Sequence, residues 1–99
     1  VNGLGANRGA PADYEEWVAA GAEGWGWEDV LPYFRRLERD LECGGVLHGT
    51  EGPLPIRRIP EDWRSGFVRA GVAQLAAEGI GEKPDQNGPW EDGVFAQKV

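Results

Sequence analysis

The stretch Gly24–Phe34, which reads GWGWEDVLPYF, decides the fold of this chain. Its tryptophan-glycine repeat predicts a turn, and the two acidic residues that follow it favour the start of a helix. Apolar residues then recur three or four positions apart, a spacing typical of a helix. The stretch therefore predicts a helix over residues 27–41, with an apolar stripe formed by Val30, Phe34, Leu37 and Leu41.

Pro32 lies several residues inside this predicted helix. A proline there removes one backbone hydrogen bond and clashes with the preceding turn, so we expect a kink, or a short turn followed by a new helix. Basic residues occupy the outer face and the last turns, where they oppose the helix dipole. This charge pattern predicts a solvated face on which Arg35, Arg36 and Arg39 pair with Glu38 and Glu42.

Two more helices are predicted on either side of this one. Residues 11–20 begin with a proline that a first helical turn tolerates, and they stop at Gly21. Residues 61–78 carry an apolar face and stop at a second glycine. Gly66 and Gly71 lie inside this third helix, where each costs about 1 kcal/mol relative to alanine. Such glycines indicate close packing of the third helix against another element.

The remaining segments predict little regular structure. Residues 54–59 are the best strand candidate, and their prolines restrict them to a sheet edge. Residues 93–99 form a second possible short strand, and the first nine residues predict a loop or an irregular extended segment. The fold class is therefore mainly α with minor β: three helices with one or two short edge strands.

Length and composition exclude several classes of protein. Ninety-nine residues allow at most one small domain. A net charge of −7 argues against nucleic-acid binding, which needs an excess of clustered lysine and arginine. No stretch approaches the roughly 20 apolar residues of a transmembrane helix. There is no signal-peptide pattern, and a lone cysteine is compatible with a reducing compartment, so we expect a cytoplasmic location. The absence of methionine suggests a piece of a longer polypeptide.

The search for catalytic or metal-binding residues is mainly one of elimination. Cys43 and His48 are the only thiol and imidazole, so a zinc site with four Cys or His ligands cannot form within this chain. His48 is best interpreted as an ordinary loop histidine. The glycines around Arg8 miss the spacing of a dinucleotide-binding loop. We therefore predict no catalytic residue and no metal ligand here.

Five tryptophans leave two interpretations open. Large aromatic residues at helical spacing usually belong to a core, but aromatic faces also suit binding of a sugar or a protein. The first interpretation predicts buried rings, and the second predicts a stand-alone, acidic, tryptophan-rich binding module for a protein or carbohydrate partner. The residues concerned are Trp17, Trp25, Trp27, Trp63 and Trp90.

Five motifs, taken in order, resemble the glucose-methanol-choline (GMC) family of FAD-dependent oxidoreductases. The resemblance covers nearly the whole chain, and the order of the motifs makes it specific although each alone would be weak. The motifs are Asn2-Gly3, Arg8-Gly9-x-Pro11-x-Asp13-Tyr14-x-x-Trp17, GWGWEDVLPYF at 24–34, HGTEGPL at 48–54, and Asp85-x-Asn87-Gly88.

This resemblance implies an internal fragment of an FAD-dependent oxidoreductase that acts on the CH–OH group of an alcohol such as choline or a sugar, by hydride transfer to the flavin. It implies a flavin-contacting loop at 1–10, a helical inter-domain region at 11–60 and the start of a substrate-side region at 61–99, within an α+β flavoenzyme. The expected partner is a small-molecule alcohol.

The resemblance also assigns the candidate cofactor-binding residues, which are Asn2, Gly3, Leu4 and Gly5. Glycines let a backbone approach a planar ring closely, and an asparagine side chain offers both a donor and an acceptor. The family's dinucleotide-binding motif and its catalytic histidine have no counterpart in these residues. We therefore expect the chain alone to be inactive and to bind FAD weakly or not at all.

Overall fold

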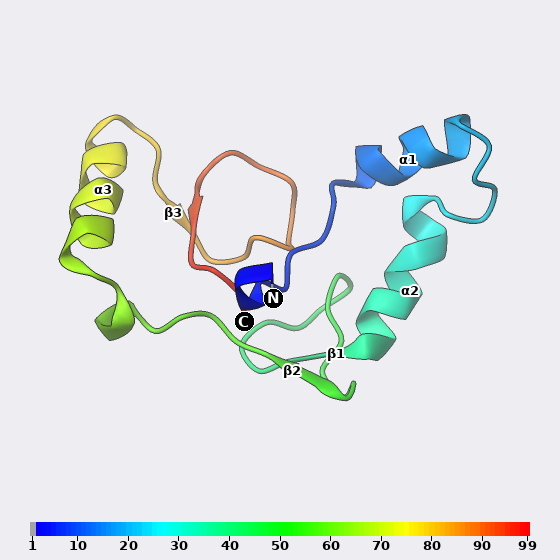
Figure 1. The fold of residues 1–99 in the computed structure, drawn as a ribbon, viewed down its shortest axis with the longest axis horizontal. Coiled ribbons are helices and arrows are strands. Elements are labelled where there is room, and N and C mark those ends of the chain that lie inside the picture. Colours follow the sequence, from blue (N-terminus) through cyan, green and yellow to red (C-terminus); the bar gives the residue numbers. More distant parts are fainter. Residues whose placement is uncertain (1) are drawn as a thin grey trace. The chain divides into compact units, whose positions relative to one another are not determined.

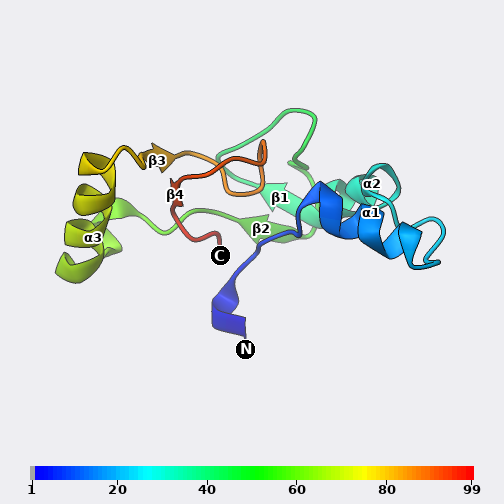
Figure 2. The same ribbon diagram turned by 90° about the horizontal axis from the view of Figure 1, so that it is seen from above.

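The computed structural model describes residues 2–99, which form two compact units. One unit is Asn7–Arg57, and the other combines the N-terminal residues through Ala6 with Arg58–Val99. Within the described residues the chain forms three α-helices and a few short strands, which Figures 1 and 2 show from two sides. The prediction of a mainly helical chain with minor β structure is confirmed.

Helix α1 (Pro11–Ala19) opens the unit Asn7–Arg57 and matches its predicted range. The Asp13 carboxylate accepts a hydrogen bond from the Ala10 amide at 2.7 Å, which satisfies one of the amide groups that a helix start leaves open. Gly21, with φ of 101°, ends the helix in a conformation that favours glycine. Figure 1 shows α1 in blue beside the cyan α2.

Helix α2 (Trp27–Leu37) begins where the sequence predicts it. Asp29 caps its start by accepting a hydrogen bond from the Gly26 amide at 3.2 Å, and Glu15 of α1 accepts one from the Trp27 amide at 3.0 Å. A single α-helix runs through Pro32, so the expected alternative of a new helix after the proline is wrong. The same helix packs against α1.

The predicted C-terminal end of this helix is wrong. Helix α2 stops at Leu37, and strand β1 (Glu38–Asp40) pairs in parallel with strand β2 (Leu54–Ile56). The intervening loop takes over the backbone bonding of β1: the Gly52 amide donates to the Glu38 carbonyl, and the Asp40 amide donates to the Gly49 carbonyl. Residues 38–41 are therefore extended and bond to the strand β2 instead of adding a helical turn.

Two loop glycines allow this arrangement. A Cβ atom on Gly49 would lie 1.7 Å from the Arg35 carbonyl oxygen, and one on Gly52 would lie 2.4 Å from the Leu37 carbonyl carbon. The loop backbone therefore contacts the end of α2 at a distance that only glycine permits. The predicted strand at 54–59 is confirmed for its first half, as an edge strand of a two-stranded sheet.

The predicted third helix starts later than expected. A 3₁₀ turn, η2 (Glu61–Trp63), comes first, and α3 (Gly66–Ala77) follows. The Ser65 side chain caps α3 by accepting a hydrogen bond from the Val68 amide at 3.3 Å, which explains the interruption.

The expectation that the α3 glycines pack closely is also wrong for the described residues. Apart from the adjacent residues and the backbone of the same helix, no atom lies within 4 Å of where a Cβ atom on Gly66 or Gly71 would be, and Phe67 is 88% exposed.

The C-terminal strand is shorter than predicted, and its partner was not predicted. Strand β4 (Val94–Phe95) pairs in parallel with β3 (Glu82–Lys83). The residues after β4 bond elsewhere, because the Ile59 amide donates to the Gln97 carbonyl at 3.0 Å. Figure 2 shows β3 and β4 side by side.

Most of the tryptophans do not lie in a core, contrary to the first interpretation of their pattern. Trp17, Trp25, Trp63 and Trp90 are each at least half exposed. The small apolar core of the described residues instead consists of Ala10, Tyr14, Val30 and Ile56.

Candidate functional site

The candidate cofactor-binding segment forms a short 3₁₀ turn, η1 (Asn2–Leu4), where a loop was expected. Gly3 and Leu4 both have φ of 59°, a left-handed conformation that is unusual for leucine. The Leu4 side chain is 75% exposed, and Gly5 is exposed as well. The Asn2 side chain lies outside the described part of the structure.

Distant residues hold this segment by its backbone, and all of them belong to the same unit. The Ala6 amide donates to the Lys98 carbonyl at 3.0 Å, and the Ala6 carbonyl accepts from Asn87 Nδ2 at 2.8 Å. The Gly3 carbonyl accepts from Gln97 Nε2 at 2.8 Å. The segment is therefore fixed on both sides of Leu4.

Asn87 and Lys98, which bond to Ala6, also belong to a polar cluster. Asp85 is its centre: the carboxylate lies 2.6 Å from Lys98 Nζ and 3.3 Å from Arg58 Nη2, and it accepts a hydrogen bond from the Asn87 amide at 3.1 Å. Lys98 is fully buried and Asn87 is 6% exposed. Buried charges need such partners, because leaving one unpaired in a poorly solvated interior is costly.

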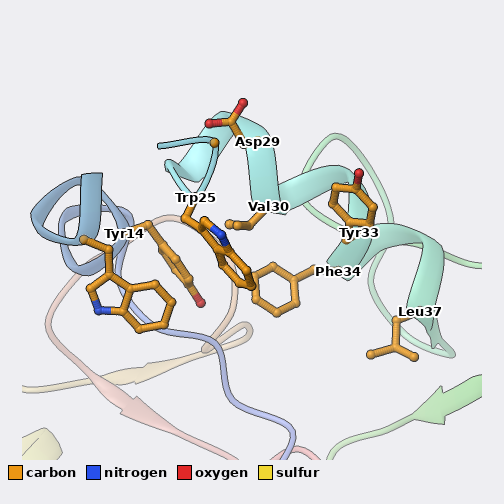
Figure 3. A pocket seen from close by; sticks show the side chains of 9 residues that line it. Tyr14, Trp25, Asp29, Val30, Tyr33, Phe34 and Leu37 are labelled. Atoms are coloured by element: carbon orange, nitrogen blue, oxygen red, sulfur yellow. The ribbon is translucent and has the colours of Figure 1, made fainter. Parts of the chain in front are cut away.

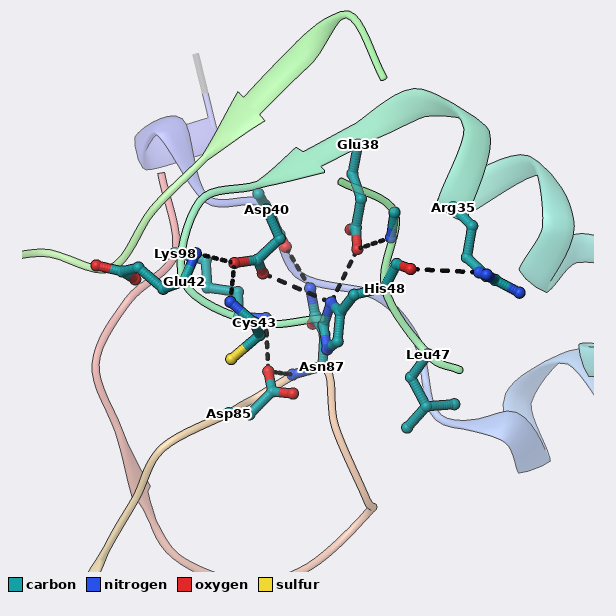
Figure 4. Close-up of polar contacts among 12 residues, drawn as sticks. Arg35, Glu38, Asp40, Glu42, Cys43, Leu47, His48, Asp85, Asn87 and Lys98 are labelled. Atoms are coloured by element: carbon teal, nitrogen blue, oxygen red, sulfur yellow. Dashed lines mark hydrogen bonds and ion pairs between the residues drawn. The ribbon is translucent and has the colours of Figure 1, made fainter. Parts of the chain in front are cut away.

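The other unit contains a second buried polar cluster, centred on Glu38 (Figure 4). Its carboxylate lies 2.5 Å from Arg8 Nη2 and 2.8 Å from His48 Nδ1, and it accepts a hydrogen bond from the Gly49 amide at 3.0 Å. Asp40 Oδ2 lies 3.5 Å from the same imidazole nitrogen. The prediction of Glu38 on a solvated helix face is therefore wrong, and His48, which lies in a loop as expected, is buried there.

This second cluster has the residue types of a metal site, but the positively charged Arg8 side chain already pairs with its central carboxylate. Ligand atoms of Glu38, Asp40 and His48 lie within 4.8 Å of one another. Both Glu38 oxygens are engaged, one by the arginine and the other by His48 and Gly49. Arg8 also donates to the Leu47 carbonyl at 2.5 Å and lies 5.4 Å from the Phe34 ring centroid. The arrangement is that of a structural ion-pair network.

An apolar cavity of about 620 Å³ lies between α1 and α2 (Figure 3). Tyr14 lies at the centre of its aromatic wall, with ring centroids 5.4 Å from Trp17 and 5.9 Å from Phe34. The two rings of Trp17 and Trp25 are 6.2 Å apart. Such spacing is typical of packed aromatic side chains, and the cavity offers apolar surface rather than a set of proton-transfer groups.

A smaller cavity of about 430 Å³ lies beside α3 in the unit that contains the candidate segment. Arg64 and Glu82 form an ion pair of 2.5 Å at this cavity. The hydrogen bond with the Glu82 carboxylate is the main cause that raises the pKa of Arg64 above its ordinary value. The other residues that line this cavity include Trp63, Val68, Phe95 and Gln97.

The fold matches that of solved flavoenzymes. A pyridoxine 4-oxidase from Mesorbium loti superposes with a TM-score of 0.83 and 35% identity, over 97% of this chain and 19% of that one. An FAD-dependent oxidoreductase from Chaetomium thermophilum shares the fold with a TM-score of 0.80 at 23% identity, over 99% of this chain and 18% of that one.

Sequence comparison shows the family. Residues 1–97 match the GMC oxidoreductase family, which is generally FAD-dependent, and the chain belongs to it. A 5-(hydroxymethyl)furfural oxidase from Methylovorus sp. is 47% identical over 96% of this chain. An oxygen-dependent choline dehydrogenase from Brucella anthropi is 37% identical over 95% of it. The chain spans about 18% of the length of these two relatives.

The matches also bear on the interpretation of the tryptophans as a stand-alone binding module. The relatives are oxidoreductases that act on alcohol groups, which confirms the resemblance and does not support a stand-alone tryptophan-rich binding module. No helix within residues 2–99 is long and apolar enough to cross a membrane.

Proposed function

We propose that this chain forms part of an FAD-dependent oxidoreductase that oxidises the CH–OH group of a small alcohol. The observation that carries the proposal is the family match over residues 1–97, which includes the candidate segment. Choline and hydroxymethylfurfural, named in two relatives, both carry a primary alcohol. A primary alcohol is therefore the proposed substrate class.

The backbone geometry of the candidate segment Asn2–Gly5 supports its proposed contact with a flavin. Its backbone turns sharply at Gly3 and Leu4, and the glycine at position 5 presents no side chain. Exposed apolar and main-chain surface of this kind suits the flat face of a ring system. We propose that these four residues line the flavin, and that bound FAD would supply the hydride acceptor for alcohol oxidation.

The same proposal assigns a role to each of the three regions of the chain. Residues 1–10 would form the flavin-contacting loop, residues 11–60 a helical inter-domain region, and residues 61–99 the start of a substrate-side region. The buried clusters around Glu38 and Asp85 would keep these regions in shape without taking part in the chemistry. The catalytic base and the nucleotide-binding motif would come from other parts of the polypeptide.

The test uses the full-length protein, by which we mean the product of the complete reading frame that encodes this chain. Its sequence should place a strand and a Gly-x-Gly-x-x-Gly motif before Val1. The purified protein should be yellow, contain about one FAD per chain and oxidise a primary alcohol, whereas residues 1–99 alone should retain no flavin and show no turnover. A colourless full-length protein that binds no added FAD would refute the proposal.

A further inference from the structure

Two side-chain amides from the far end of the sequence hold the backbone on which the proposed flavin contact depends. Asn87 donates to the Ala6 carbonyl and Gln97 donates to the Gly3 carbonyl, each at 2.8 Å. These partners are 81 and 94 positions apart in the sequence. The two hydrogen bonds lie on either side of Leu4, which is one of the two left-handed residues.

The Asn87 side chain is itself fixed by the turn in which it lies. The Asn87 amide donates to the Asp85 carboxylate, a bond that aspartate commonly makes in such turns. A Cβ atom on Gly88 would lie 2.6 Å from Asp85 Oδ2, so glycine leaves room for this carboxylate. Asp85 is held in turn by the fully buried Lys98 at 2.6 Å. The sequence DQNG therefore forms a rigid base for one hydrogen-bond donor.

The Gln97 side chain is fixed through its backbone. The Gln97 carbonyl accepts from the Ile59 amide at 3.0 Å, and the next residue, Lys98, forms an antiparallel bridge with Arg58. The Lys98 carbonyl also accepts from the Ala6 amide. The same short backbone stretch thus binds the candidate segment by one main-chain and one side-chain hydrogen bond.

We propose that Asn87 and Gln97 are positioning residues that hold the Gly3–Ala6 backbone in the shape that contacts the flavin; this rests on the proposed function above. A leucine in the left-handed region is strained, and such strain persists only where surrounding contacts fix it. The two amides supply these contacts without touching the flavin themselves. Their loss should let the segment relax and weaken the cofactor contact.

The experiment compares Asn87→Asp and Gln97→Glu in the full-length protein. Each change keeps the side-chain size and removes the donor, and Gln86→Glu makes the same chemical change one residue before Asn87 as a matched control. In each test variant we expect the FAD dissociation constant to rise about tenfold, as for loss of one hydrogen bond. The visible absorption of bound flavin should shift, and the backbone amides of residues 4–6 should exchange hydrogen faster than in the control.

The outcomes separate this inference from the proposed function. If the wild type binds FAD and both test variants match the control in affinity, flavin spectrum and hydrogen exchange, the positioning role is refuted while the proposed function stands. If the wild type binds no FAD, the proposed function itself fails. If Asn87→Asp does not fold, Gln97→Ala still tests the inference, because Gln97 is exposed. The same loss of FAD affinity and of protection from hydrogen exchange is expected for this variant.

Discussion

At the scale of single residues, Glu38 shows how a charged side chain can leave the helix face that its spacing indicates. Its carboxylate binds a guanidinium, an imidazole and a backbone amide, and the residue is 3% exposed. Arg8, one of these partners, is 30 positions earlier in the sequence, and a local pattern of charges cannot indicate such a pairing. The HGTEG motif contributes to the family resemblance, but its local sequence does not predict that His48 is buried.

The first prediction concerns this buried carboxylate. The substitution Glu38→Gln should lower the free energy of unfolding of the full-length protein by about 3–5 kcal/mol. The reason is that the buried Arg8 charge loses the carboxylate with which it pairs. The measurement is the midpoint of urea denaturation. Glu16→Gln on the exposed face of α1 is the control and should change little. Equal midpoints for the two variants would show that the buried pair does not stabilise the fold.

At the scale of elements, the sequence predicted helices better than their ends. The start of α2 follows from its acidic first turn and its apolar period, and both act locally. Its end at Leu37 depends on the loop glycines that reach it from residues 49–52, and on pairing with β2. The two-residue pairing of β3 and β4 is equally non-local. Helix periodicity therefore predicted the helices, whereas strand partners needed the structure.

The contact between loop and helix end leads to a second prediction. Gly49→Ala should destabilise the full-length protein by about 1–3 kcal/mol or more, because the added methyl group meets the backbone of Arg35, which cannot rotate away. Gly44→Ala in the same loop is the matched control, since its Cβ would lie 4.0 Å from the nearest atom, Thr50 Cγ2. Thermal unfolding compares the two. A Gly49→Ala protein as stable as the control would contradict the close approach.

At the scale of the whole molecule, the order of short motifs predicted more than any single residue. No segment of the chain is diagnostic alone, but five segments in order indicated the family that comparison confirms. The family resemblance also indicates the segment Asn2–Gly5 as a cofactor-binding candidate. In the structure this segment has a strained backbone, which hydrogen bonds from Asn87 and Gln97 anchor. Those anchors could not be predicted, because side chains 81 and 94 positions away provide them.

The central claim is that the full-length protein passes a hydride from a primary alcohol to FAD. The most direct measurement is the visible absorption of the purified full-length protein, recorded without oxygen before and after addition of 5-hydroxymethylfurfural, choline or another primary alcohol. We predict an oxidised flavin spectrum that bleaches on addition of at least one alcohol and returns when oxygen or another electron acceptor is admitted. A flavin-free spectrum, or a flavin that no primary alcohol bleaches, would contradict the account.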